Sequence, residues 1–288
     1  MIVIIRHMTS GQRPPPHPVD RARLTQFAPL APPVHRYEPA AAHTPWVRHY
    51  WVPVWDLPED HTVTEYVLQY PSCLVVISDS YARFYGVVTG RSQVELSGHG
   101  WAVGIMLQPG AGPSVFGQSD LSHLADTHCD LAVVPSMAPT IAATRTTMAA
   151  DPASVDRHRR AIEQLEGRLD TLPAVTAEAR QVSALVATVE SDPDLRTVAE
   201  LSDRAGWSER QLQRVLRRYL GLAPKWLIQR RRLHEATDRL KHGSMNLADL
   251  AHDLGYTDQA HFTRDFRKVT GYSPGAFARS QVRPREDL

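Results

Sequence analysis

Two stretches near the carboxyl end of the chain carry arginine and glutamine side chains at matching positions. In the first stretch the candidates are Arg210, Gln213, Arg214 and Arg217, and in the second they are Gln259, Thr263, Arg264, Arg267 and Lys268. Arginine can form two parallel hydrogen bonds to guanine O6 and N7, and glutamine can do the same to adenine N6 and N7. The basic residues nearer the end of each stretch suit phosphate oxygens. These residue types therefore predict double-stranded DNA as the partner.

Both stretches belong to an internal repeat with an offset of fifty residues. The offset aligns apolar, basic, glycine and proline positions: Leu212 with Phe262, Arg214 with Arg264, Leu216 with Phe266, Gly221 with Gly271 and Pro224 with Pro274. Such self-similarity indicates one structural unit that is used twice. Any single basic residue here could be a solvated surface charge, but a solvated surface does not account for the repeated pattern.

Each copy has the local signals of a helix-turn-helix. The expected first helices, 197–205 and 247–254, are followed by Gly206 and Gly255, and glycine readily takes the positive φ of a helix end. Ser208 and Thr257 are expected to cap the second helices. Apolar residues at i, i+4 and i+7 of each second helix turn one face inward, which leaves the arginines and glutamines outside.

A further helix is expected to join the two copies. Pro224 suits its first turn, and Leu227, Leu233, Ala236 and Leu240 form an apolar side. A helix over residues 224–241 is about 27 Å long at a rise of about 1.5 Å per residue. Together with its flanking elements, it can place two recognition helices in successive major-groove segments, about 34 Å apart on one face of DNA.

Charge is divided unevenly along the chain, although the whole has a formal net charge of +1. Residues 1–194 hold 14 Lys and Arg against 20 Asp and Glu, whereas residues 195–288 hold 18 against 11. A basic carboxyl-terminal third favours contact with phosphates, because that contact releases condensed counterions. Charge alone leaves open the alternative of a solvated basic surface.

The carboxyl-terminal third resembles the AraC/XylS family of transcription regulators over residues 195–280. The matching motif is LADLAHDLGY at 247–256, then Gln259, Phe262, Arg264, Phe266 and GYSP at 271–274. The resemblance implies a bipartite, all-α DNA-binding domain of seven helices, 194–282, with two helix-turn-helix units, and a short tail follows at 283–288. Ser202 departs from the usual alanine, which Ala251 keeps in the second copy, and we expect serine to be small enough to fit.

Short apolar runs between turn residues predict strands within residues 26–138. The runs are 46–55, 63–70, 73–78, 83–88, 93–96 and 101–107, and breakers such as Pro58, Gly90 and Pro109 separate them. They predict a small antiparallel barrel or sandwich, with a cupin-like β-barrel or jelly roll as the expected form, so that the whole chain is α+β with two domains. The stretch 1–25 is rich in proline without a hydrophobic period, and we expect a flexible tail there.

The region from Pro71 to Asp126 resembles the cupin-like amino-terminal domain of such regulators, which implies a sensor for a small-molecule effector. Aromatic residues are the candidates for its pocket: Trp46, Trp51, Tyr66, Tyr70 and Trp101. Aromatic side chains on strands are commonly core residues instead, and that alternative stays open for each of them.

Two amphipathic helices are expected between the domains, within residues 139–193. Ile162, Leu165 and Leu169 share one face of the first, 155–169, and an apolar face centred on Val182 and Val186 follows in the second, 174–191. These helices either link the domains, pair two copies of the chain in a homodimer, or pack on the chain's own barrel.

The sequence indicates no metal, cofactor or enzyme chemistry. The histidines of the amino-terminal half lack the close His-x-His spacing of a cupin metal site. Cys73 is flanked by Tyr, Pro, Ser, Leu and Val, which favours a buried structural thiol over an alkyl-accepting thiolate.

No run approaches the roughly 18–20 apolar residues of a membrane helix, and two distant cysteines form no disulfide framework. We therefore expect a bacterial-type cytoplasmic protein at the nucleoid that regulates transcription in response to a small molecule. An activator would also contact RNA polymerase. The alternatives are a ligand-independent regulator whose barrel only dimerises, and a DNA-modifying or metal-dependent enzyme that uses the carboxyl-terminal domain for targeting.

Overall fold

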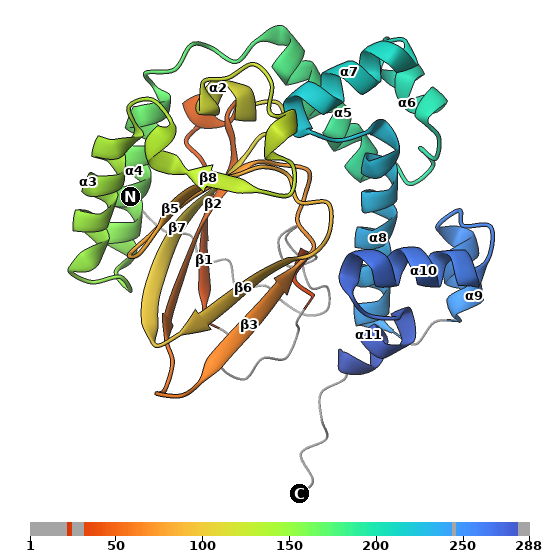
Figure 1. Ribbon diagram of the computed structural model, residues 1–288, viewed down its shortest axis with the longest axis horizontal. Coiled ribbons are helices and arrows are strands. Elements are labelled where there is room, and N and C mark those ends of the chain that lie inside the picture. The colour runs from red at the N-terminus through yellow and green to blue at the C-terminus, as the bar shows by residue number, and fades with distance from the viewer. Residues whose placement is uncertain (1–21, 25–31, 244–245, 282–288) are drawn as a thin grey trace, which may run out of the picture.

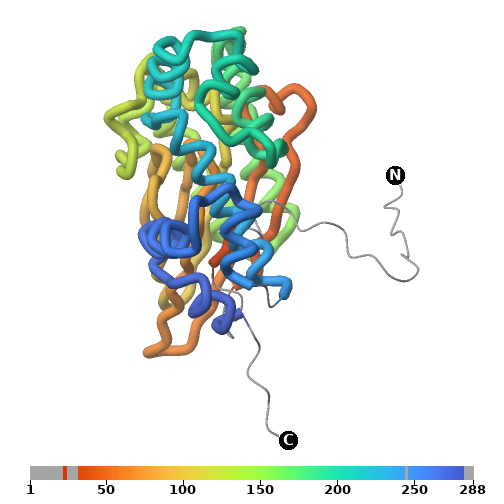
Figure 2. Tube along the Cα trace, turned by 90° about the vertical axis from the view of Figure 1, so that its right-hand side faces the viewer, coloured from red at the N-terminus to blue at the C-terminus, as the bar shows by residue number. Residues whose placement is uncertain are grey.

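The computed structural model describes residues 22–24, 32–243 and 246–281. An antiparallel sheet with covering helices forms the amino-terminal domain, and helices alone form the carboxyl-terminal domain (Figure 1). The carboxyl-terminal helices lie along one side of the sheet domain, as the turned view also shows (Figure 2). The predicted α+β architecture with two domains is confirmed; the tails predicted at 1–25 and 283–288 lie almost wholly outside the described residues.

A six-stranded antiparallel sheet forms the centre of the amino-terminal domain. Its order is β1 (Val34–Tyr37), β2 (Val47–Asp56), β7 (His99–Leu107), β4 (Leu74–Ser78), β5 (Ala82–Tyr85) and β8 (His128–Asp130). The remaining strands, β3 (Thr62–Val67) and β6 (Ser92–Ser97), pair with each other in a separate sheet. All six predicted runs contain a strand, whereas the short β1 and β8 were not predicted.

The strands form an open sheet rather than a closed barrel, which was one of the two arrangements expected from the sequence. Among the described strands, β1 and β8 each have one hydrogen-bonded neighbour, so the six-stranded sheet has two free edges. The β3–β6 pair faces the larger sheet without joining it through a strand ladder. The hydrogen bonds that would close a ring are therefore not made between these strands.

Three helices after the sheet pack within the chain. They are α3 (Met137–Ala149), α4 (Val155–Leu169) and α5 (Ala177–Ser191), and a short α2 (Gly112–Phe116) precedes them. The apolar faces of α4 and α5 are buried in the same core as one face of the sheet. The chain itself thus covers the faces that were considered for a homodimer. The sequence did not predict α3, whose many Ala and Thr residues give little hydrophobic period.

Among the described residues, six helices lie within 194–282, one fewer than the seven that the resemblance implies. The first helix-turn-helix is α6 (Val198–Ala205) and α7 (Glu209–Leu220), and the second is α9 (Leu247–Asp253) and α10 (Gln259–Thr270), followed by α11 (Pro274–Ser280). The joining helix α8 (Pro224–His242) begins with proline in its first turn, as expected.

Among the described residues, the two largest of four hydrophobic clusters divide the molecule differently from the two domains. The larger core runs from the sheet through α5 into α6 and α7. The smaller core joins α8 to α9, α10 and α11, and it includes Leu24 and Leu68 of the amino-terminal domain. Both helix-turn-helix units are therefore packed against the sheet domain rather than tethered to it.

Candidate nucleic-acid interface and effector cavity

The first candidate recognition helix, α7, presents its predicted contact residues to solvent. The Ser208 hydroxyl caps the helix by accepting from the Gln211 N–H at 3.3 Å. Leu212, Leu216 and Tyr219 are buried on the inner face. The outer face carries the predicted contacts Arg210, Gln213, Arg214 and Arg217, all of them exposed.

The second candidate recognition helix, α10, repeats this arrangement with one difference at its start. Asp258 rather than Thr257 is the cap, because its carboxylate accepts the His261 N–H at 2.7 Å. The prediction of Thr257 was wrong by one residue. The predicted contacts Gln259, Arg264, Arg267 and Lys268 are exposed, and Thr263 is half-buried.

The turn before each recognition helix has the geometry that its glycine was expected to allow. Gly206 has a φ of 64° and Gly255 one of 73°. Ser202, the departure from the family pattern, is buried where α6 meets α7, and its hydroxyl donates to the Trp207 carbonyl. Serine therefore fits at this helix crossing, as expected.

The basic residues of the two outer faces differ from most of the other arginines of the domain. Among the described residues, none of the predicted contact side chains forms a hydrogen bond or an ion pair. By contrast, Arg218 pairs with Glu178 of α5, and both Arg231 and Arg239 pair with Glu235 at 2.9 and 2.5 Å. Six cations without a partner among the described residues thus lie on the two faces that the repeat makes equivalent.

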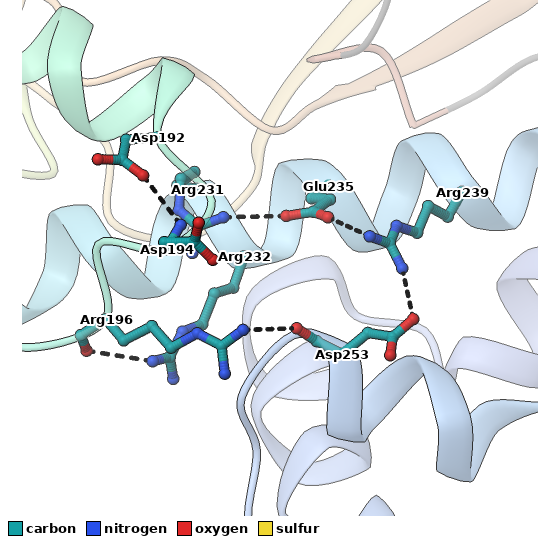
Figure 3. A network of polar contacts seen from close by, with 8 residues as sticks. All are labelled: Asp192, Asp194, Arg196, Arg231, Arg232, Glu235, Arg239 and Asp253. Atoms are coloured by element: carbon teal, nitrogen blue, oxygen red, sulfur yellow. Dashed lines mark hydrogen bonds and ion pairs between the residues drawn. The ribbon is translucent and has the colours of Figure 1, made fainter.

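A polar network fixes the two helix-turn-helix units relative to each other (Figure 3). On α8, Arg239 bridges Glu235 and the Asp253 carboxylate at the end of α9, the latter at 3.0 Å. From the segment that enters α6, Arg196 reaches the Asp253 carbonyl, and its own carbonyl accepts from Arg232 at 3.2 Å. Both units are thereby tied to one rigid helix.

The amino-terminal domain contacts both recognition helices at their carboxyl ends. At the end of α7, the Arg218 carbonyl accepts from the Leu121 N–H at 2.8 Å. At the end of α10, the Thr270 carbonyl accepts from the Arg91 guanidinium at 3.1 Å. These contacts leave the predicted contact residues at the amino-terminal halves of both helices open.

The loop at residues 88–92 also holds α8. Arg230 is 2% exposed, and its Nη2 donates to the carbonyls of Val88, Thr89 and Gly90 at 2.8, 2.6 and 3.0 Å. Burial lowers the pKa of Arg230 to about 9, which leaves the guanidinium charged at neutral pH. The loop is therefore bound to the joining helix by a buried cation.

A second loop, which runs into β8, is attached to the first. The Thr89 N–H and hydroxyl donate to the Asp126 carboxylate at 2.6 and 2.7 Å. Both loops contribute to the wall of one cavity through Val88, Ser92 and Asp126. The same short segments thus line a cavity and hold the carboxyl-terminal domain.

This cavity, of about 390 Å³, lies between the β3–β6 pair and one face of the six-stranded sheet. Its volume falls within the range of roughly 300–1,000 Å³ that is typical of small-molecule sites. The lining is mainly apolar and aromatic, and its charged members include Arg23 and Glu65, which form an ion pair at 2.6 Å. It is a candidate effector site.

The structure separates the five aromatic residues that were candidates for the effector pocket. Trp51 lines the cavity, whereas Trp46 and Trp101 pack with the core on the other face of the sheet. Tyr66 lies edge-on to Tyr272 of the carboxyl-terminal domain, and Tyr70 stacks on His234 of α8 with ring centroids 4.4 Å apart. Trp55, which the sequence also offered as an aromatic residue of this domain, lines the cavity, and so do Tyr81 and Tyr85, which the sequence did not indicate.

The remaining candidates for reactive chemistry were the Cys73 thiol and a metal site. Cys73 is 2% exposed, and burial raises the pKa of its thiol to about 12, which disfavours a reactive thiolate. No group of three or more His, Cys, Asp or Glu side chains suited to a metal ion occurs among the described residues. Within the same residues, no helix combines the length and apolar character that crossing a bilayer requires.

Comparisons with known proteins agree with the geometry of the two helix-turn-helix units. Residues 201–280 match a family described as a helix-turn-helix domain, and residues 35–130 match a domain of unknown function, DUF6597. The transcriptional activator RhaS of Pectobacterium carotovorum is 34% identical over 87 residues, which are 30% of this chain and 31% of RhaS. The probable transcription factor PqrA of Proteus vulgaris is 31% identical over 84 residues, which are 29% of this chain and 69% of PqrA.

The match thus spans about a third of the length of RhaS. Among solved structures, a regulator with an AraC-type DNA-binding domain from Chromobacterium violaceum is 25% identical, with a TM-score of 0.31, over 36% of this chain and 90% of that one. ToxT from Vibrio cholerae is 13% identical, with a TM-score of 0.39, over 87% of this chain and 97% of that one.

Proposed function

This chain belongs to the AraC/XylS family of DNA-binding transcription regulators, and we propose that it binds two half-sites of a promoter and that a small-molecule effector controls this binding. The α7 face carrying Arg210, Gln213, Arg214 and Arg217 would contact one half-site. The α10 face carrying Gln259, Thr263, Arg264, Arg267 and Lys268 would contact the other.

The observation that carries the proposal is the distribution of uncommitted cations. Side chains that must form new hydrogen bonds to bases and phosphates should have no partner within the protein, since breaking existing bonds would oppose binding. The outer faces of α7 and α10 meet this condition among the described residues, while the arginines on α8 are engaged. At about 28 Å for its 19 residues, α8 is long enough to separate two helices that enter successive major-groove segments.

The effector would bind in the cavity between the two sheets. The two loops that line the cavity also hold α8 and the ends of α7 and α10, so a change in the cavity wall could alter the placement of the recognition helices. If the chain activates transcription, RNA polymerase would be a further partner. A homodimer would need a surface other than the buried faces of α4 and α5.

Selection from a random DNA library, followed by gel-shift titration of the full chain, tests the proposal. We expect Arg214→Ala and Arg264→Ala each to weaken binding by about 1–3 kcal/mol and to relax selectivity at one base pair in different half-sites. Arg159→Ala is a matched control, because it removes an exposed cation from α4 of the amino-terminal domain.

Half-site spacing gives an independent measurement. Inserting about five base pairs between the half-sites turns one half-site by about half a helical turn, and we expect a large loss of affinity. Equal affinity for all DNA sequences, or indifference to the insertion, would contradict the proposal.

A further inference from the structure

The cavity has a floor of two tryptophan side chains that lie over glycines. On β2, Trp51 and Trp55 are separated by an even number of positions and therefore point to the same face of the sheet. In the register with β7, Trp51 is opposite Gly104 and Trp55 is opposite Gly100. A large residue on one strand thus faces a residue without a side chain on its neighbour.

The glycines are needed for the position of the indole rings. A Cβ atom added at Gly104 would lie 2.2 Å from Cε2 and 2.6 Å from Cδ2 of Trp51, and one at Gly100 would lie 2.7 Å from Cε2 of Trp55. The Cε2 and Cδ2 atoms of Trp51 are ring-fusion carbons without hydrogen, and they can be approached closely only through a ring face. The Trp51 indole therefore lays one face on the β7 backbone at Gly104 and leaves the other toward the cavity, while Trp55 lies against Gly100 with Cζ2 as its nearest atom.

The charged groups of the cavity wall are already paired. Arg23 forms two hydrogen bonds to the Glu65 carboxylate at 2.8 and 2.6 Å, and Asp126 accepts two from Thr89. Arg36 also has an interaction partner. A charged ligand would have to break one of these pairs, since burying an unpaired charge is costly.

One buried side-chain oxygen of the wall lacks a hydrogen-bond partner among the described residues. The Gln69 side chain donates through Nε2 to the Ser92 hydroxyl at 3.0 Å, whereas its Oε1 is buried and accepts no hydrogen bond from the described residues. Gln69 lines the cavity. A hydroxyl or N–H group on a ligand would satisfy this oxygen.

We propose that the cavity binds a flat, uncharged aromatic molecule that stacks on the Trp51 indole and donates one hydrogen bond to Gln69 Oε1. This inference rests on the proposed function, in which the cavity holds the effector, and it adds the chemical class of that effector. A sugar would bring several donors and acceptors to a mainly apolar and aromatic wall, in which Gln69 Oε1 is the one buried side-chain oxygen without a partner among the described residues. A carboxylate would find both described arginines of the wall, Arg23 and Arg36, already engaged.

Calorimetry and tryptophan fluorescence on the full chain test the ligand class with matched probes. We expect 2-naphthol to bind and to quench fluorescence, and decahydro-2-naphthol, its saturated counterpart, to bind at least tenfold more weakly because it cannot stack. Naphthalene should bind several-fold more weakly than 2-naphthol because it has no donor, and 2-naphthoate at least tenfold more weakly because it is charged. Equal affinity for the flat and saturated alcohols, or no binding of 2-naphthol, would overturn the proposal.

Variants localise the binding. Trp51→Leu should weaken 2-naphthol at least tenfold while changing the affinity for decahydro-2-naphthol little, and Gly104→Ala should act in the same direction by displacing the Trp51 ring. Trp46→Leu, on the other face of the sheet, should leave both affinities unchanged. Circular dichroism shows whether each variant is folded, and equal losses for Trp51→Leu and Trp46→Leu would refute the assignment.

A gel shift without any ligand separates this inference from the proposed function. Sequence-selective DNA binding together with no stacking preference overturns the ligand class alone. Loss of selective DNA binding overturns the proposed function as a regulator. Tighter binding of 2-naphthol than of decahydro-2-naphthol in the same preparation would still support the aromatic site.

Discussion

Replacing Arg230 with methionine should detach the loop at 88–92 from α8. The guanidinium is buried, donates to three carbonyls of this loop, and lies 4.5 Å from the centre of the Trp226 ring. Methionine keeps much of the apolar packing but cannot donate a hydrogen bond. The change therefore removes one specific connection between the two domains and preserves most of the buried volume.

The magnitude follows from the hydrogen bonds lost and the charge removed. A hydrogen bond from a charged donor contributes about 1.5–3 kcal/mol, and here one Nη2 atom serves three acceptors, so we count roughly one to two such bonds. Relief from burying a guanidinium offsets part of the loss. We expect a net decrease of about 2–3 kcal/mol in the free energy of unfolding, or roughly 4–12 °C in Tm.

Denaturant unfolding and amide hydrogen exchange measure the effect. In Arg230→Met, exchange should become faster at residues 88–92, and a ligand in the cavity should lose its influence on DNA affinity. Lys225→Met, which removes an exposed cation from the same helix, is the control and should stay within about 0.5 kcal/mol of the wild type. The reasoning would be refuted if both variants lost the same stability or if exchange at 88–92 were unchanged.

Three further predictions concern other parts of the molecule. Arg239→Ala should weaken binding to DNA with two half-sites more than binding to a single half-site, because it loosens the link from α8 to α9; equal losses in gel shifts would contradict this. A thiol reagent at pH 8 should modify Cys129 before Cys73, since burial raises the pKa of Cys73 to about 12, and simultaneous labelling in mass spectra would count against it. Burial, with a smaller effect of Arg230, lowers the pKa of His234 to about 3, so this neutral histidine stabilises the fold fully above pH 6.5 and progressively less as the pH falls toward 3. His234→Phe, which keeps a ring against Tyr70, should flatten the loss of Tm between pH 7 and 4.5, and an unchanged slope would exclude this cause.

The carboxyl-terminal domain could be predicted from the sequence because its signals act over a few residues. The positive φ of Gly206, the capping bond of Ser208 and the place of Pro224 in the first turn of α8 all involve near neighbours. The wrong prediction of Thr257 as the cap also concerns immediate neighbours in the chain. Asp258 directly precedes the helix and offers a carboxylate, which is a stronger acceptor for the His261 N–H than a hydroxyl.

The cavity could not be predicted, because it depends on pairing between distant strands. Trp51 and Trp101 were equal candidates in the sequence. Because neighbouring residues of a strand point to opposite faces, Trp101 lies on the core face of β7, whereas Gly100 and Gly104 lie on the cavity face. The even spacing from Trp51 to Trp55 indicates a shared face but not which face is hollow. That information lies in a register between residues about fifty positions apart in the chain.

The amino-terminal domain contacts the two copies of the repeat at equivalent positions. Gly221 and Gly271 end α7 and α10 at equivalent positions, and both meet the amino-terminal domain: a Cβ at Gly221 would lie 2.8 Å from Cβ of Ala125, and one at Gly271 would lie 2.5 Å from Nη1 of Arg91. Ala125 and Arg91 belong to the two loops that line the cavity. A movement of the cavity wall would therefore reach the same point of both recognition helices, at the ends opposite the predicted base contacts. We accordingly expect a ligand to change the affinity for paired half-sites and their preferred spacing, and to leave the base preference within each half-site unchanged. Library selection with and without 2-naphthol measures both, and a ligand-dependent base preference would show that the coupling does not act through these helix ends.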